Sequence, residues 1–177
     1  MQRGLAVRRE RDDLVPYVFS LSLNQPMPDR RSLSTGTPWE RAFAYRRAVR
    51  VGSLVFVSGT TGVGDDGRVV EPDDAHAQAR RAFARIEAAL GALGASLGDV
   101  VRTRMFVTDI ARDGDAVGRA HGEVFGPTMA ATGHAPVATM VEVRALIDPA
   151  MRVEIEADAV VGDAIAGSPG DDAEAVR

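Results

Sequence analysis

The sequence of 177 residues contains no cysteine. Disulfides, thiol catalysis and thiolate metal sites are therefore excluded, and this composition fits a reducing cytoplasm. No apolar run approaches the roughly 18–20 residues that a membrane helix needs. The arginine-rich N-terminus also lacks the apolar region of a signal peptide. We therefore expect a cytoplasmic protein with no membrane partner.

A surplus of basic residues is also missing. The chain has 21 Lys and Arg against 25 Asp and Glu, which gives a formal net charge of −4. Proteins that bind nucleic acid usually carry a basic patch, so we expect no nucleic-acid partner. A local cluster does exist at Arg46, Arg47 and Arg50. We interpret it as the solvated face of an exposed strand.

Histidine is scarce, and the three that occur, His76, His121 and His134, are far apart. None has the i, i+4 spacing of a helical zinc pair, and no Ser-His-Asp arrangement stands out. Residues 62–67, GVGDDG, match the letters of a dinucleotide fingerprint. A short strand and Pro72 separate them from the next helix, and two aspartates would repel phosphate, so a glycine-rich turn is the better interpretation. We expect no metal and no cofactor.

The chain divides into three parts by composition. Residues 1–35 are rich in Arg, Asp, Ser and Pro without a sustained period, which is typical of a flexible extension. Residues 163–177 are small and polar and are interpreted as a disordered tail. Between them, residues 36–162 form one domain, which is long enough to bury a sizeable core.

Hydrophobic periodicity in this domain predicts the order β-β-β-α-β-α-β-β. Strands are expected at 42–52, 54–60, 67–70, 99–110, 136–147 and 151–161. A helix is expected over 71–96, capped by Asp73 or Asp74, and a second over about 113–125. The helical spacing of Phe83, Ile86, Leu90 and Leu93 gives the first helix an apolar face. The order predicts an α/β sandwich with two helices on one face of a mixed sheet.

Three strands combine an apolar face with a charged one. In the last strand Arg152, Glu154, Glu156 and Asp158 alternate with Val153, Ile155, Ala157 and Ala159. The same period assigns Arg102, Arg104 and Phe106 to one face, and likewise Ala138, Met140, Glu142 and Arg144. It assigns Val101, Thr103, Met105, Val107, Val141, Val143 and Ala145 to the face under the helices. The charged face could lie in water, or subunits could pack their sheets together there.

The last two strands carry a resemblance. The segment HAPVATMVEVRALIDPAMRVEIEADAV resembles the C-terminal signature of the Rid (YjgF-like) family of reactive-intermediate deaminases. VGSLVFVSGT, the helix and strand from Ala77 to Ile110, and AHGEVFG also resemble parts of this family, so the similarity covers about residues 40–161. The resemblance implies a chorismate-mutase-like fold and a homotrimer whose sheets form a central barrel. Three pockets would lie between its subunits.

The resemblance also implies roles for individual residues. Glu154 matches the glutamate that is thought to hold a water for imine or enamine hydrolysis, and it is the expected catalytic residue. Tyr45, Ser58 and Gly59 match pocket residues, and Ala138, Thr139 and Met140 fall in the pocket segment of the next-to-last strand. In the best-known branch an arginine stands two residues after the proline and grips the substrate carboxylate. Here that position is Ala138.

Two functions are compatible with this pattern. The first is a hydrolase for a labile C–N metabolite such as an imine or enamine, with Arg104 or Arg102 as a replacement anchor. The same arginines could instead be structural partners of Glu142 or Glu156, since buried charges need partners. The second is a non-catalytic trimer that binds a small molecule or regulates a partner, which Ala138 and Met140 favour by making the pocket more apolar. RNA cleavage is the least favoured, because net charge and histidine placement oppose it.

Overall fold

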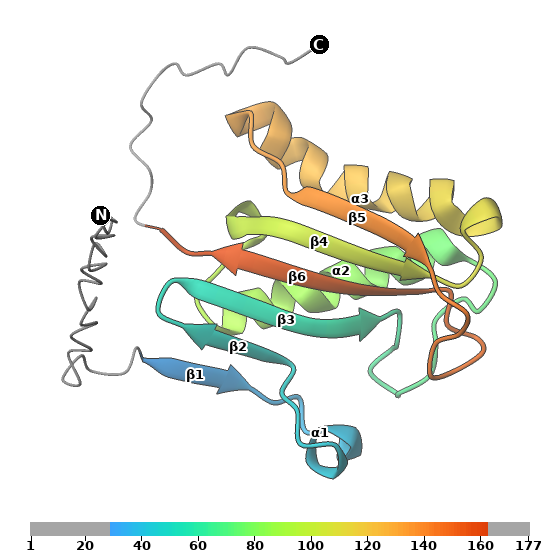
Figure 1. The fold of residues 1–177 in the computed structure, drawn as a ribbon, viewed down its shortest axis with the longest axis horizontal. Coiled ribbons are helices and arrows are strands. Elements are labelled where there is room, and N and C mark those ends of the chain that lie inside the picture. The colour runs from blue at the N-terminus through green and yellow to red at the C-terminus, as the bar shows by residue number, and fades with distance from the viewer. Residues whose placement is uncertain (1–28, 163–177) are drawn as a thin grey trace, which may run out of the picture.

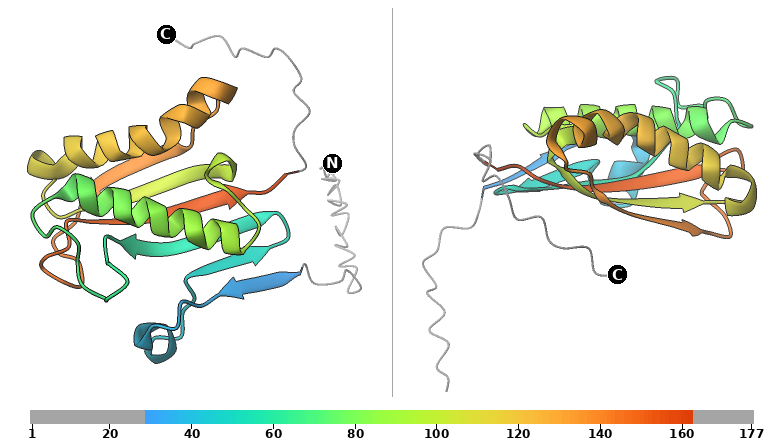
Figure 2. Two further views of the ribbon diagram at one scale, coloured as in Figure 1. Left: turned by 180° about the vertical axis from the view of Figure 1, so that it is seen from behind. Right: turned by 90° about the horizontal axis from the view of Figure 1, so that it is seen from above.

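The computed structural model describes residues 29–162, so most of the predicted extension and the whole predicted tail lie outside the described residues. Six strands form one sheet in the order β1-β2-β3-β6-β4-β5, and two long helices cover one of its faces (Figures 1 and 2). Neighbouring strands are antiparallel except β4 and β5, which are parallel. The predicted α/β sandwich with a mixed sheet is confirmed.

The elements alternate along the chain as the fold requires. The strands are β1 (Arg30–Leu33), β2 (Ala48–Val51), β3 (Leu54–Thr61), β4 (Val100–Val107), β5 (Val137–Glu142) and β6 (Val153–Val160). The helices are α1 (Pro38–Ala42), α2 (Ala75–Ala92) and α3 (Ile110–Thr132), with a short 3-10 turn at Leu97–Asp99. The crossover through α3 is what makes β4 and β5 parallel.

Aspartate caps fix where the two long helices begin. Asp74 accepts a hydrogen bond from the Ala77 N–H, so of the two predicted candidates, Asp73 and Asp74, it is Asp74 that caps α2. Asp109 accepts one from the Arg112 N–H and starts α3 three residues earlier than predicted. The helix ends at Thr132, later than predicted, and the following Gly133 has the positive φ of 75° of a left-handed cap.

The strands near the N-terminus differ from the prediction. The predicted strand over 42–52 begins only at Ala48, because Pro38 starts a short helix in front of it. The predicted strand at 67–70 is only one bridge, between Val63 and Val69, because the glycine-rich turn leaves no room for a longer ladder. Instead β1, within the segment assigned to the extension, pairs with β2 at the edge of the sheet.

Strand β6 has the predicted alternation. Val153, Ile155, Ala157 and Ala159 are buried in the core, where Phe83, Ile86 and Leu90 of α2 are also buried. Glu154, Glu156 and Asp158 are half-buried on the open face, which lies toward the viewer in Figure 1. Arg152 was wrongly placed with them. It lies before the strand and pairs with Asp73 and Asp113, the latter on α3.

The faces assigned to β4 and β5 also need correction. Val101 is exposed because the β4–β6 register shifts between Val100 and Arg102. In β5, Met140 pairs with Met105 and therefore lies on the helix side, with Ala138 and Glu142. The Glu142 carboxylate accepts a hydrogen bond from the first N–H of α3, that of Ile110. Hence Val137, Thr139 and Val141 share the open face, a one-residue inversion of the predicted pattern.

Candidate active site

A bulge in β3 brings three predicted site residues together. The β3–β6 register shifts between Val57 and Thr60, so Ser58 and Gly59 lie outside the regular ladder. The Glu154 carboxylate packs against the Gly59 Cα so closely that a Cβ there would overlap its Oε1. Bulges often redirect side chains next to active sites. Here the bulge lets a glutamate side chain lie directly over the backbone of the neighbouring strand.

Arg47 supports this bulge from the segment that leads into β2. Its Nη1 donates to the Gly59 carbonyl at 2.8 Å, to Thr60 Oγ1 at 3.1 Å and to Ser58 Oγ at 3.3 Å. Its backbone carbonyl accepts a hydrogen bond from the Ser58 N–H. Only 7% of Arg47 is exposed, so the interpretation of its cluster as a solvated face is wrong for this residue.

Glu154 is positioned from its N-terminal side by a buried glutamine. The Gln78 side chain on α2 accepts a hydrogen bond from the Arg152 N–H at 2.8 Å and donates to the Ala150 carbonyl at 3.0 Å. Because Gln78 is fully buried, these bonds hold the start of β6 against α2. Gly62 lets this helix approach, since a Cβ there would lie 2.6 Å from the Gln78 Cα.

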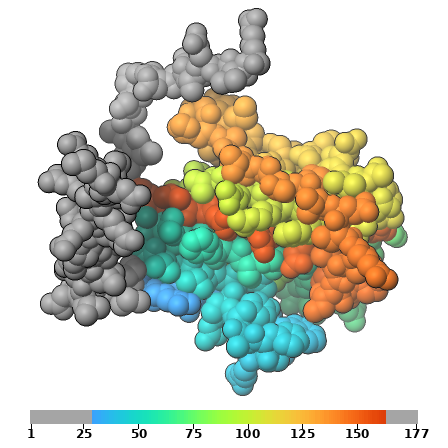
Figure 3. Space-filling model, in the orientation of Figure 1, coloured from blue at the N-terminus to red at the C-terminus, as the bar shows by residue number. Residues whose placement is uncertain are grey.

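A cavity of about 630 Å³ opens beside Glu154. Its walls include Thr37, Trp39, Phe43, Tyr45, Arg47, Ser58, Gly59, Thr61, Arg85, Ile147, Met151 and Glu154. Trp39 of α1 and Phe43, the residue that follows α1, stack with ring centroids 5.5 Å apart and are 55% and 64% exposed. In the space-filling view the cyan segment that contains α1 projects from the lower edge of the molecule (Figure 3). The cavity thus has a polar floor and an aromatic wall.

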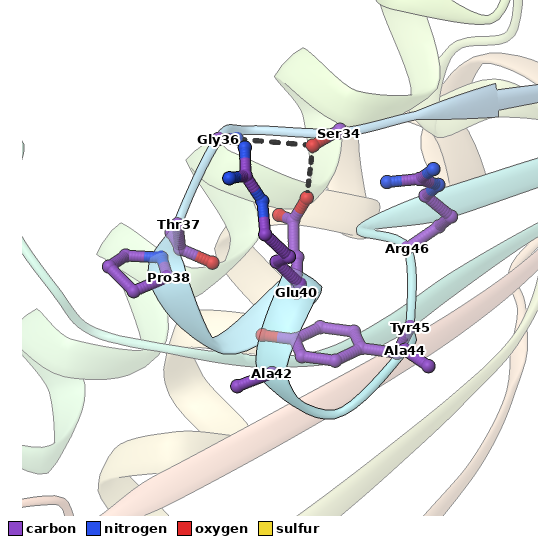
Figure 4. A pocket seen from close by; sticks show the side chains of 10 residues that line it. Ser34, Gly36, Thr37, Pro38, Glu40, Ala42, Ala44, Tyr45 and Arg46 are labelled. Atoms are coloured by element: carbon purple, nitrogen blue, oxygen red, sulfur yellow. Dashed lines mark hydrogen bonds between the residues drawn. The ribbon is translucent and has the colours of Figure 1, made fainter.

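A buried carboxylate holds α1 in place. Glu40, only 3% exposed, accepts hydrogen bonds from the Ser34 hydroxyl and from the Thr35 hydroxyl and N–H. Burial raises the pKa of Glu40, but these hydrogen bonds outweigh it and hold the pKa below its ordinary value. Figure 4 shows Glu40 reaching Ser34 across a second hollow of about 880 Å³, with Tyr45 between α1 and β2. Tyr45 lines both hollows.

The electrostatics of Glu154 suit general-base chemistry. Burial raises the pKa of its carboxyl, repulsion from Glu156 adds to the rise, and Arg47 opposes it. Glu154 forms no ion pair with any other residue among 29–162. A carboxylate whose pKa lies closer to neutrality removes protons from water more effectively.

The structure brings together only part of the predicted site. Tyr45, Ser58, Gly59 and Glu154 line one cavity. Arg104 lies elsewhere on the open face and pairs with Glu156 at 3.3 Å and Asp158 at 3.1 Å. Ala138, Thr139 and Met140 lie on β5, at the other edge of the sheet and outside this cavity. Their role as pocket residues remains a prediction.

Sequence reasoning missed Arg47 and Arg85 as cavity residues. Arg85 lies on α2 and donates from Nη1 to the Thr61 carbonyl at 3.0 Å. Burial, and then repulsion from Arg47 and Arg81, lower the pKa of Arg85. No pattern in the sequence distinguishes these arginines from the many solvated ones. Arg47 is recognisable only in the structure, where its guanidinium donates hydrogen bonds to the Ser58–Gly59 bulge of β3 and to Thr60.

Two features of the described part of the chain bear on partners. Among residues 29–162 no group of three or more His, Cys, Asp or Glu side chains is arranged to hold a metal ion. In the same range no helix has the length and apolar character to cross a bilayer. The choice of function therefore depends on the cavity.

The fold and site define a class: a small α/β sandwich with a carboxylate and arginines in a cavity beside its sheet. The sequence profile of the family described as Endoribonuclease L-PSP matches residues 38–161. The chain belongs to this family, which confirms the resemblance to the Rid (YjgF-like) proteins.

Several relatives have similar sequences or structures. An uncharacterized Streptomyces coelicolor protein is 36% identical over 132 residues, which cover 75% of this chain and 92% of the relative. The 2-iminobutanoate/2-iminopropanoate deaminase of Salmonella typhimurium is 37% identical over 116 residues, 66% of this chain and 86% of that enzyme. A solved Mycobacterium tuberculosis structure, described as a member of the YjgF/YER057c/UK114 family, is 51% identical with a TM-score of 0.65. That match covers 75% of this chain and all of the other.

Proposed function

We propose that this protein hydrolyses an imine, an enamine or a related labile C–N metabolite in the cavity beside Glu154. The observation that carries the proposal is the Glu154 carboxylate itself. It is half-buried, forms no ion pair with another described residue, lies over the Ser58–Gly59 bulge, and has a raised pKa. The related Salmonella typhimurium protein is a 2-iminobutanoate/2-iminopropanoate deaminase.

In the proposed reaction Glu154 accepts a proton from water while the water oxygen attacks the carbon of the C=N bond. The nitrogen gains protons, the C–N bond breaks, and the products are a carbonyl compound and ammonia. Tyr45, with its hydroxyl, and Ser58 are the neutral polar groups that would orient the substrate in the cavity.

We further propose that the protein is a homotrimer whose open sheet faces pack together. Charged side chains in the middle of this face are flanked by exposed apolar ones: Leu54 and Phe56 on β3, and Val137 and Val141 on β5. An exposed apolar surface of this kind is typical of an interface. In such a trimer a neighbouring subunit would bring the β5 edge of its sheet, the segment of Ala138, Thr139 and Met140, to the cavity, and Thr139 is the one of the three on the open face.

The test generates imino acids in situ with an amino-acid oxidase and follows their trapping by semicarbazide. Wild-type protein should compete with semicarbazide and slow formation of the trapped product. We expect Glu154→Gln to lower the hydrolysis rate at least about 100-fold, the range of a lost general base. Glu156→Gln is the matched control, because it changes the same group on the same face of β6, and it should retain activity. Equal activity of wild type and Glu154→Gln would refute the proposed mechanism.

The second candidate function is a non-catalytic small-molecule binding protein. It is favoured by Ala138, which can neither pair with a carboxylate nor donate a hydrogen bond. If Ala138→Arg gains activity that the wild type lacks, the fold and Glu154 are competent but the natural ligand is a different one. A metabolite retained through purification, without turnover, would support this alternative.

RNA cleavage has less support, although the family description includes the word endoribonuclease. The cavity contains no histidine. His76 pairs with Glu123, and His134 is exposed after α3. His121 packs beside Phe83 and Phe125, and its Nε2 lies 3.0 Å from Thr103 Oγ1. A histidine acid–base pair is therefore not assembled in the described residues.

A further inference from the structure

Arg47 has donors that the protein leaves unused. Only Nη1 bonds to the bulge, while Nε is fully buried without a hydrogen-bond partner. Nη2 forms no hydrogen bond with the other described residues. A buried charged donor without an acceptor is costly, and such a group in a cavity wall calls for an explanation. The residue is only 7% exposed, and it lines the cavity of Glu154.

The lining of the cavity also carries an excess of positive charge. It contains two guanidinium groups, Arg47 and Arg85, but one carboxylate, Glu154. Neither arginine forms a salt bridge with a carboxylate of residues 29–162. An anion that entered this cavity would add a negative charge beside the two guanidinium groups and an acceptor for Nη2 of Arg47.

Gly59 relates the two charged groups to each other. Its carbonyl accepts the Arg47 hydrogen bond, and the Glu154 carboxylate packs against its Cα. An anionic group held at Arg47 would therefore lie close to the atoms on which Glu154 acts. A 2-imino acid, whose carboxylate is bonded directly to the imine carbon, has the compactness that this arrangement requires.

We propose that Arg47 anchors the carboxylate of the substrate, in place of the arginine that the family resemblance implies at position 138. This assignment rests on the proposed C–N hydrolysis at Glu154. It differs from the earlier hypothesis of Arg104, which already pairs with Glu156 and Asp158. Because Arg47 lies just before β2 and Ala138 lies in β5, the anchor would come from a different part of the chain than the arginine of the best-known branch.

The test measures ligand binding rather than turnover, by calorimetry on the full chain. The probes are pyruvate, the expected product from 2-iminopropanoate, and methyl pyruvate, its uncharged ester. We expect wild-type protein to bind pyruvate more tightly than the ester. Arg47→Gln should weaken pyruvate binding about 10- to 100-fold, the loss of one charge-assisted hydrogen bond, and change ester binding little. Arg46→Gln, which removes the same charge from the exposed neighbouring residue, should leave both affinities unchanged.

Several results would overturn the assignment. The first is that the wild type binds pyruvate no more tightly than the ester. The second is that Arg47→Gln binds pyruvate as tightly as the wild type. The third is that Arg47→Gln loses equal affinity for both probes. Equal losses would indicate that Arg47 only supports the bulge. If Arg47→Gln does not fold, Arg47→Lys keeps the charge, and it should bind pyruvate more weakly while retaining the preference. Loss of that preference would also contradict the proposal.

The anchoring role and the hydrolytic function fail in different ways. Glu154→Gln should still bind pyruvate with the wild-type preference, because it leaves Arg47 in place. If no imine is hydrolysed but this preference holds and depends on Arg47, the hydrolysis proposal fails and the anchor remains. If hydrolysis depends on Glu154 but not on Arg47, the opposite conclusion follows.

Discussion

The two ends of the charged face of β6 differ although they share one strand and one pattern. At one end Glu156 and Asp158 both pair with Arg104. At the other end Glu154 lies over a glycine, forms no ion pair with a described residue, and has a raised pKa. The two strands that flank β6 cause this difference. Arg104 of β4 pairs with Glu156 and Asp158, whereas the bulge of β3 makes room for Glu154. Paired carboxylates suit structure, and an unpaired one suits chemistry.

The largest effect that would break this comparison is expected from Gly59→Ala. The new methyl group would overlap Glu154 Oε1 and push the carboxylate out of position. Because only the end of a flexible side chain has to move, we expect the melting temperature to change little. Hydrolysis should fall about 100-fold, since misplacement of a catalytic group by about 1 Å has that cost. Steady-state rates and thermal unfolding of the same sample test both parts, and unchanged activity would contradict the assigned position of Glu154.

The pH dependence of stability would sharpen the comparison. The folded-state pKa of Glu154 is raised, so the folded state binds the proton more tightly than the unfolded state. Its contribution is therefore most favourable at pH values below the ordinary carboxyl pKa and is lost as pH rises through the raised value. Relative to Glu154→Gln, the wild type should lose free energy of unfolding as the pH rises above the ordinary carboxyl pKa of about 4. Urea unfolding of both proteins across this range measures it, and a constant difference would argue against the shift.

At the paired end, Arg104→Gln should lower the free energy of unfolding by about 1 kcal/mol, because these ion pairs are partly exposed. We expect the loss in urea unfolding at low salt and a smaller loss at high salt. Hydrolysis should fall far less than in Gly59→Ala. A comparable fall would instead return Arg104 to the binding set that the sequence predicted.

The smallest effect is expected from Ala44→Gly, which tests whether the turn before Tyr45, a residue of the Glu154 cavity, stores backbone strain. Ala44 has a positive φ of 55° in the turn that leads from α1 to Tyr45. Glycine adopts this conformation freely, so the variant should gain about 0.5 kcal/mol or somewhat more in free energy of unfolding. Thermal unfolding beside Ala42→Gly, within α1 and expected to be destabilising, provides the check. If Ala44→Gly also lowers the free energy of unfolding, the backbone at Ala44 is not strained.

Much of the fold could be predicted because its signals are local. Helix α2 shows its cap and its apolar stripe in consecutive turns, and β6 alternates without interruption. The errors lie where distant segments decide. The register of β4 and β5 turns Met140 toward the helices, and pairing with β2 makes a strand of residues 30–33. Neither partner is visible from the local pattern.

The candidate site divides in the same way. Family resemblance identified Glu154, Tyr45, Ser58 and Gly59, and the structure brings these four to one cavity. The interpretation of Arg47 as solvated is wrong, although an arginine in an exposed strand is usually solvated. Its guanidinium is held by the bulge of β3, which lies 11 to 13 residues further along the chain.

By itself the sequence determined the family, the sandwich, the placement of the two long helices and the presence of a charged face on β6. Periodicity and capping are properties of neighbouring residues, and they survive without knowledge of the rest of the chain. Only the tertiary structure decided which carboxylate is paired, which arginine is buried and which side of β5 faces the helices. These outcomes depend on strand register, and a shift of one residue exchanges the two faces of a strand.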